Sequence, residues 1–218
     1  MTDHVAPEPL DTIAGSVRAE IEVSRSRFIA DLVPIADEPG ASDVVAAARR
    51  EFHGARHHCS AWVLGPDGQR VRSNDDGEPA GTAGAPMLAV LEGAALTDVV
   101  AVVTRYFGGT LLGAGGLVRA YGDTVSAAVV AAERRRRRLV SRVEVQVAHA
   151  EAGKLEHLLR RWVEGARGAV DDVRYGPTAI HLVVAVPLDE KAELLAALAA
   201  SGVTHRVGEL GEAIRALR

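Results

Sequence analysis

The stretch Arg56-His57-His58-Cys59 gathers side chains that commonly hold metal ions or act as bases and nucleophiles. A strand is predicted over residues 58–64, and neighbouring side chains of a strand point to opposite faces of the sheet. His57 and His58 are therefore not expected to share one ion, and the sequence predicts no bound metal and no cofactor. A structural role, or a place in a polar network, is the alternative for these residues.

Three carboxylates, those of Asp75, Asp76 and Glu78, fall within four residues of the segment 73–79. Such a cluster could bind a hard cation, receive a basic partner or perform acid–base chemistry. The segment is also rich in the Asn, Asp, Gly and Pro residues of solvated turns, and it lacks the full ligand pattern of a calcium loop. Both interpretations stay open at this point.

Two glycine-rich segments each precede a predicted helix: 81–84, and 108–116 between Arg105 and Arg119. Backbone N–H groups at a helix start and guanidinium groups both favour anions, so a small anionic ligand is predicted here. The second segment lacks the Gly-Lys-Ser/Thr of a phosphate loop, and Val118 stands where a dinucleotide fingerprint needs its third glycine. Glycines can instead serve positive φ angles or close packing. The glycines assigned to this binding loop are Gly108, Gly109, Gly113, Gly115 and Gly116.

Hydrophobic periodicity indicates the elements that must position these groups. Alternation over residues 17–23 predicts a strand, and the apolar run 98–107 predicts a central strand covered on both faces. The other elements expected in this half are a strand at 28–35, a helix capped by Ser42 or Asp43 and ending before Gly54, a hairpin of strands 58–64 and 70–73, and helices starting near Pro86 and Gly115.

The helix from Gly115 is expected to bury a stripe made of Val118, Tyr121, Val125, Ala128 and Ala132. The five arginines 134–138 are expected to close it, because cations at a helix C-terminus complement the helix dipole. A contact with RNA or with an acidic protein is the alternative for this run.

From residue 139 the pattern restarts as strand 139–149, helix 151–164, strands 168–175 and 178–186, helix 188–200 and strand 203–210. This βαββαβ order predicts a ferredoxin-like fold. The sequence therefore indicates an α+β protein with a loose leader over residues 1–15, an N-terminal domain over 16–138 and a C-terminal domain over 139–218.

The composition of the chain excludes several classes of protein. A formal net charge of −4 excludes a broadly basic nucleic-acid-binding protein, and a single cysteine excludes intrachain disulfides and multi-cysteine zinc sites. The first residues lack the basic and apolar regions of a signal peptide, and no uncharged apolar run approaches the ~20 residues that span a bilayer. A cytoplasmic protein without membrane contact is expected.

Three segments together resemble the YigZ/IMPACT family: RHHCSAWVLG, SNDDGEPAGTAGAPMLAVLEG and VTRYFGGTLLGAGGLVRAYGDTV. The block from Arg105 and Tyr106 through Gly116 matches the family's signature. The resemblance implies an N-terminal domain related to the second domain of ribosomal protein S5 and a C-terminal domain similar to the last domain of elongation factor G. It carries over Arg56, His57, His58, Asp75, Asp76, Glu78 and the Arg105–Arg119 loop as site residues.

The same resemblance implies a role in translation. Eukaryotic members of the family regulate translation by binding a ribosome-associated activator of an initiation-factor kinase, whereas bacterial members have no settled activity. This chain has its ferredoxin-like part where eukaryotic members place a different domain before the shared one, so their partner is not carried over.

Three functional hypotheses follow. The first is a binding protein in translation or its regulation, with RNA or a ribosome-associated protein as partner. The second is a small hydrolase or phosphoryl-transfer enzyme that uses His57 or His58 with Asp75, Asp76 or Glu78 beside the anion-binding loop. The third is an adaptor whose C-terminal sheet binds another protein.

Overall fold

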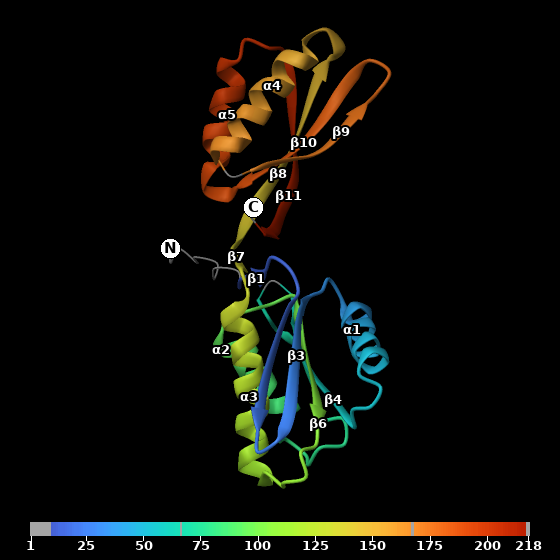
Figure 1. The fold of residues 1–218 in the computed structure, drawn as a ribbon. Helices are drawn as coiled ribbons and strands as arrows, with labels where there is room; N and C mark the ends of the chain where they lie inside the picture. Colours follow the sequence, from blue (N-terminus) through green and yellow to red (C-terminus); the bar gives the residue numbers. More distant parts are fainter. Residues whose placement is uncertain (1–9, 66, 167, 217–218) are drawn as a thin grey trace. The chain divides into compact units, whose positions relative to one another are not determined.

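The computed structural model describes residues 10–65, 67–166 and 168–216. The chain divides into two compact units, an N-terminal unit up to Arg136 and a C-terminal unit from Arg137 onward. Each unit has its own sheet and its own buried core, and together they make an α+β protein (Figure 1).

The N-terminal unit is built on a five-stranded antiparallel sheet. Its strands, in spatial order, are β2 (Val17–Val23), β3 (Ser26–Pro34), β6 (Val99–Tyr106), β4 (His57–Leu64) and β5 (Arg70–Asn74). Residues 99–103 of β6 are fully buried. This central position explains the apolar run in the sequence, because both faces of the strand are covered.

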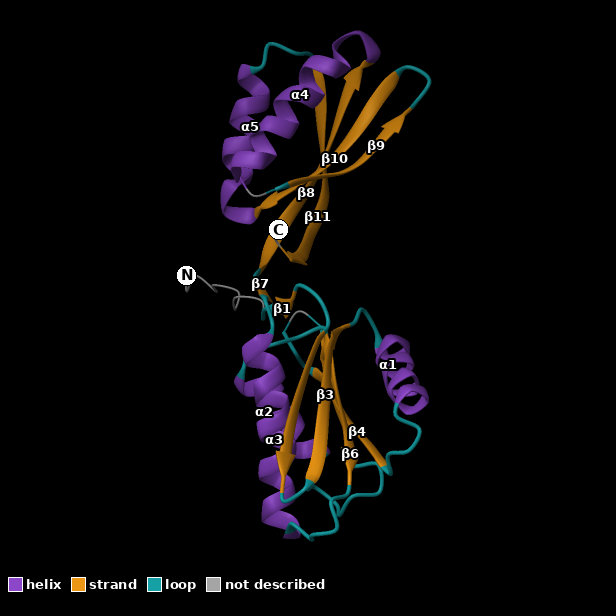
Figure 2. Cartoon of the chain, in the orientation of Figure 1, coloured by secondary structure: helices purple, strands orange, loops and turns teal. Residues whose placement is uncertain are grey.

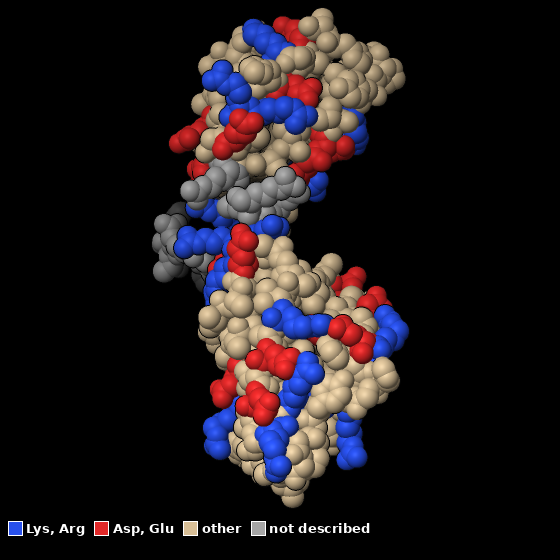
Figure 3. All heavy atoms as spheres, in the orientation of Figure 1, with Lys and Arg blue, Asp and Glu red and all other residues tan. Residues whose placement is uncertain are grey.

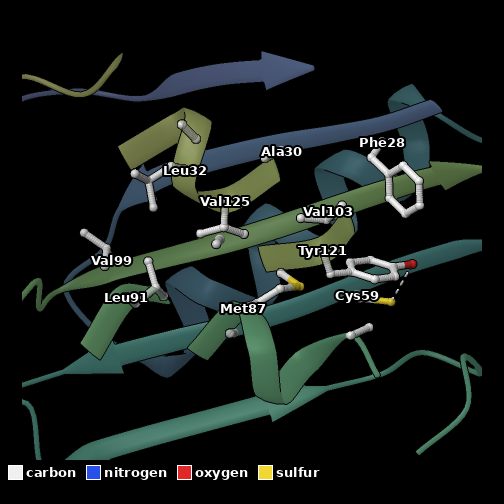
Figure 4. Close-up of a cluster of buried hydrophobic side chains, with 14 of the residues drawn as sticks. Phe28, Ala30, Leu32, Cys59, Met87, Leu91, Val99, Val103, Tyr121 and Val125 are labelled. Atoms are coloured by element: carbon white, nitrogen blue, oxygen red, sulfur yellow. Dashed lines mark hydrogen bonds between the residues drawn. The ribbon is translucent and has the colours of Figure 1, made fainter. Parts of the chain in front are cut away.

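Helices cover both faces of this sheet (Figure 2). α2 (Gly84–Gly93) and α3 (Gly113–Ala131) pack on one face, where the core contains Phe28, Met87 and Tyr121 (Figure 4). α1 (Glu38–Glu51) packs on the other face against Trp62 and its neighbours. The alternation of β4 therefore sends odd-numbered side chains toward α2 and α3 and even-numbered ones toward α1.

The helices of this unit start earlier than the sequence predicted. The cap of α1 is Asp37, whose side chain accepts a hydrogen bond from the backbone N–H of Gly40, so the prediction of Ser42 or Asp43 was wrong. A proline in the first helical turn also favours this earlier start. α2 and α3 each start two residues before the predicted position, and the buried stripe of α3 uses Leu117 whereas Val118 is exposed.

The arginine run does not close a helix. α3 ends at Ala131, Arg134–Arg135 form strand β7, and β8 (Arg137–Ala148) follows. β7 pairs with β1 (Thr12–Ile13), which supplies an extended partner for the chain at this point. The helix-dipole interpretation was therefore wrong, and Arg134 instead donates to the carbonyl of Ala94 at 2.7 Å.

The described part of the segment preceding β2 is not the loose leader that was expected over residues 1–15. Ile13 is buried, Asp11 bridges to Leu96, and Thr97 donates its backbone N–H to the Asp11 carbonyl at 2.8 Å. Residues 11–13 are therefore an integral part of the fold. Residues 1–9, which the same expectation covered, lie outside the described residues.

The C-terminal unit follows the predicted βαββαβ order. After β8 come α4 (His149–Ala166), β9 (Ala169–Tyr175), β10 (Ala179–Pro187), a short 3₁₀ turn (Leu188–Glu190), α5 (Lys191–Ala200) and β11 (His205–Ala216). The antiparallel sheet has the spatial order β11-β8-β10-β9, that of a ferredoxin-like split βαβ fold. Both helices lie on one face, and Leu155, Leu182 and Leu194 are in the core between them and the sheet.

Charged side chains of both signs are interspersed on the visible face of each unit (Figure 3). That view agrees with a formal net charge of −4 distributed over the whole chain. None of the described helices combines the length and the apolar character needed to cross a membrane.

Candidate binding pocket of the N-terminal unit

A pocket of about 410 Å³ opens in the N-terminal unit where β4 begins and β6 ends. Its polar side is formed by Arg56, His57, Glu78 and Arg105. Its apolar side comes from the loop after β6 and the first turn of α3, chiefly through Phe107, Leu111, Leu112 and Leu117. Three sequence segments that are far apart in the chain therefore meet at one opening.

Strand register explains how the polar side is assembled. His57 of β4 and Arg105 of β6 are directly opposite each other in an antiparallel pair. Cross-strand partners point to the same face, here the face that carries α2 and α3. His58 points to the other face and does not line the pocket.

A buried ion pair forms the floor of the polar side. Arg105 Nη1 donates to Glu78 Oε1 at 2.6 Å, and the Tyr121 hydroxyl donates to the same oxygen at 2.7 Å. Arg105 and Glu78 are 7% and 8% exposed, so the attraction between them is weakly screened. The guanidinium carbon of Arg105 also lies 5.4 Å from the ring centre of Phe28 and 5.7 Å from that of Phe107.

Cys59 lies behind this floor and is not among the residues that line the pocket. Its thiol is within hydrogen-bond reach of the Asp75 carbonyl, at 3.0 Å. It is also within reach of the Tyr121 hydroxyl, at 3.3 Å (Figure 4). Burial raises the pKa of Cys59 to about 12 and also raises the pKa of Tyr121. Both groups are therefore neutral near pH 7, and Cys59 has the environment of a structural thiol.

The two histidines have different environments. The ring of His57 places Nδ1 2.9 Å from the Asp76 carbonyl oxygen. Because a carbonyl oxygen only accepts, Nδ1 carries the hydrogen, and Nε2 is the acceptor of the neutral ring. His58 is buried, and neither of its ring nitrogens makes a well-formed hydrogen bond among the described residues, although the Phe52 backbone is close enough to favour the protonated ring. Burial lowers the pKa of His58, which keeps this ring neutral.

The three carboxylates of the segment 73–79, here called the acidic turn, have different partners. Asp75 accepts hydrogen bonds from the backbone N–H groups of Gly81 (2.8 Å), Ala83 (3.0 Å) and Gly84 (2.8 Å), so it caps the start of α2. Asp76 accepts from the backbone N–H of His58 at 2.6 Å and pairs with Arg49 of α1. Only Glu78 lines the pocket, and joint chemistry by all three carboxylates is excluded by these separate attachments.

Asp75→Asn is expected to lower the free energy of unfolding by about 2 kcal/mol at pH 7, because hydrogen bonds to a charged acceptor are lost and an amide NH₂ faces a backbone N–H. Burial opposes ionisation of Asp75, but the hydrogen bonds from Gly81, Gly84 and Ala83 outweigh it and lower its pKa. The stabilisation is thus present above the ordinary carboxyl pKa and is lost as the pH falls through the lowered one. Urea denaturation should show the two proteins converging below about pH 4; a constant difference down to pH 2 would contradict this role.

Comparison with known proteins shows the family of this chain. Residues 24–129 match the model of the Impact N-terminal domain. The chain is 42% identical over 149 residues to IMPACT family member YvyE of Bacillus subtilis, covering 68% of this chain and 69% of the relative. It is 39% identical over 188 residues to IMPACT family member YigZ of Escherichia coli, covering 85% of this chain and 90% of the relative. The chain belongs to the IMPACT family.

A solved structure extends the similarity beyond the Impact N-terminal domain. The crystal structure of a hypothetical protein aligns with 92% of this IMPACT-family chain and 96% of its own chain, at 37% identity and a TM-score of 0.67. The residue blocks that indicated the family in the sequence all fall within the matched segment 24–129.

The glycine-rich loop of this IMPACT-family chain has two physical roles. Gly108 is in close contact with the turn between β2 and β3, since a Cβ there would lie 2.0 Å from the carbonyl carbon of Arg25. Gly109 and Gly113 adopt positive φ angles of 85° and 68°, which favour glycine. Of the five predicted loop glycines, Gly113 lines the pocket, whereas Gly115 and Gly116 belong to the first turn of α3 without lining it.

Two other predicted site residues lie outside the pocket. Tyr106 projects from the opposite face of β6, where the guanidinium of Arg27 lies 5.8 Å from its ring centre. Arg119 is exposed on α3. For Tyr106, a one-residue step along the strand turns the side chain to the opposite face. The guanidinium of Arg119 lies beside the first turn of α3, where a Cβ at Gly115 would be 3.7 Å from its Nη1.

Sequence reasoning missed the apolar side of the pocket. Leu111 is 87% exposed and Phe107 is 53% exposed, although both are large apolar residues. A signal was available, because exposed loops are usually polar and the pair Leu111-Leu112 interrupts a run of Gly, Thr and Ala.

Proposed function

We propose that this IMPACT-family protein is a binding protein acting in translation or its regulation, and that the pocket of the N-terminal unit holds its ligand or partner. Family membership supports the translational role, and a ferredoxin-like second unit is a fold that recurs in translation proteins, which is support by analogy. RNA or a ribosome-associated protein is the partner that we propose.

One observation carries the choice of binding over catalysis: the one carboxylate that lines the pocket, that of Glu78, is held in a buried ion pair with Arg105. Glu78 accepts from both Arg105 and Tyr121, while the surface left open to solvent is largely apolar. Exposed apolar side chains beside a few fixed polar groups are typical of recognition sites.

The same geometry weakens the enzyme alternative. A hydrolase or phosphoryl-transfer enzyme was expected to combine His57 or His58 with Asp75, Asp76 or Glu78. Of these pairs only His57 and Glu78 both line the pocket, and there Glu78 is held by Arg105 and Tyr121. His58, Asp75 and Asp76 do not line the pocket, because they lie on the other face or anchor secondary structure. General acid–base catalysis requires its groups to reach one reacting centre.

Co-sedimentation with ribosomes and binding to ribosomal RNA, both at low salt, test the translational role. We expect association in at least one assay, and we expect Leu111→Ser to weaken it by removing an apolar contact at the mouth of the pocket. Val130→Ser is the matched control, since Val130 is 86% exposed on α3 and does not line the pocket. Absence of both associations, or equal effects of the two substitutions, would contradict the proposal.

A further inference from the structure

Hydrogen-bond donors in the pocket outnumber the acceptors that satisfy them. The Arg105 guanidinium has five N–H donors, and within the described ranges of the chain Nη1 alone is paired, with Glu78. Its Nε is buried and has no hydrogen-bond partner among the described residues. A buried donor without a partner costs free energy. Because Nε is enclosed, the other N–H groups of the Arg105 guanidinium, which lines the pocket, are the ones left to meet a ligand.

Two further donors face the same space. Arg56 lines the pocket, is exposed, and has no ion pair or side-chain hydrogen bond within the described part of the chain. The first turn of α3 borders the pocket through Gly113 and Ala114, and Leu112 at its N-cap position makes no side-chain capping bond. Uncapped N–H groups at a helix start carry partial positive charge.

The charges of the residues that line the pocket indicate which ligand charge would complement them. Arg105 and Glu78 balance each other, which leaves Arg56 and the helix start as the net positive contribution. Glu78 would repel a second negative charge, so a singly charged anion fits better than a doubly charged phosphate. The opposite wall consists of Phe107, Leu111, Leu112 and Leu117, which would cover an apolar body.

The geometry points to a binding site for a small organic monocarboxylate with an apolar body. The carboxylate of the ligand lies between Arg56 and the start of α3. Its apolar body lies against the apolar side of the pocket, formed by Phe107, Leu111, Leu112 and Leu117. A volume of about 410 Å³ is in the range of small-ligand sites. This inference deepens the proposed function, and it rests on that function in treating the pocket as the binding surface.

Titration calorimetry with octanoate tests the inference, with octanol as the uncharged probe and hexane-1-phosphonate at pH 8.5 as the doubly charged one. We expect octanoate to bind more tightly than either. Arg56→Gln should weaken octanoate binding about tenfold, the effect of losing one charge-assisted contact. Arg50→Gln is the matched control, because Arg50 is an exposed arginine of α1, on the opposite face of the sheet, and does not line the pocket. Equal affinities for octanoate and octanol, or equal effects of the two substitutions, would overturn the inference.

Amide chemical shifts give a readout that locates the ligand. Octanoate should shift the backbone resonances of Gly113 and Ala114 more than those of Gly93, a glycine outside the pocket. A peptide ending in Gly-Leu with a free carboxylate, compared with its C-terminal amide, tests a protein C-terminus as the source; binding of the peptide without binding of octanoate would overturn the small-molecule assignment. Octanoate binding without ribosome or RNA association would contradict only the proposed function, and the reverse pattern would contradict only the carboxylate site.

Discussion

Gly108→Ala will strongly destabilise the N-terminal unit, by about 3 kcal/mol or more. A Cβ at this position would lie 2.0 Å from the carbonyl carbon of Arg25 and 2.4 Å from the backbone nitrogen of Ser26. These are backbone atoms of the turn between two paired strands, so they cannot move aside by changing a rotamer. The loop would have to detach from the turn, and the apolar side of the pocket would be displaced with it.

Urea denaturation can assign this loss to one unit, because each unit contains one tryptophan, Trp62 and Trp162. In a Trp162→Phe background, fluorescence reports on the N-terminal unit, and there Gly108→Ala should shift the midpoint to lower urea. Gly93→Ala is the control, since nothing lies within 4 Å of a Cβ at that helical glycine. A wild-type midpoint for Gly108→Ala would mean that the loop does not contact the turn in solution.

Breaking the buried ion pair between Arg105 and Glu78 should destabilise the N-terminal unit by a similar amount. Arg105→Met leaves the Glu78 carboxylate buried without its cation, and we expect a loss of about 3–5 kcal/mol in the free energy of unfolding. Glu78→Gln leaves the cation of Arg105 without its anion, and a loss of similar size is expected for the same reason.

The double variant distinguishes a buried pair from two independent contacts. Arg105→Met combined with Glu78→Gln removes both charges, so it should recover most of the loss seen in either single variant. Arg27→Met, at the exposed pair with Glu20, should change stability little, because solvent screens exposed pairs. Additive losses in the double variant, measured by urea denaturation, would show that the two residues act independently.

Local hydrophobic patterns in the sequence predicted much of the fold, because they reflect directly which side chains of an element are buried. The alternation over β2 and the apolar run of β6 follow from one half-buried and one fully buried strand. The start of α1 was missed because Asp37, Ser42 and Asp43 are all chemically able to cap, and the sequence does not show which carboxylate or hydroxyl meets a free N–H. The arginine run was misassigned because its extended conformation depends on a distant partner, β1.

The candidate pocket was predictable only in part, for a related reason. Arg56, His57, Glu78 and Arg105 were recognisable by residue type, and the structure brings them to one opening. The pairing of His57 with Arg105 depends on strand register across 48 positions, which no local pattern encodes. Asp75 and Asp76 looked equivalent to Glu78 in sequence, yet their backbone acceptor roles arise only once α2 and β4 are in place.

The pairing of β1 with β7 brings the entry and exit of the N-terminal unit together, since Thr12 lies opposite Arg135 and Ile13 opposite Arg134. A unit whose chain enters and leaves at adjacent points can be inserted into different polypeptides, or circularly permuted, without disturbing its core. Such a module is independent of what precedes or follows it.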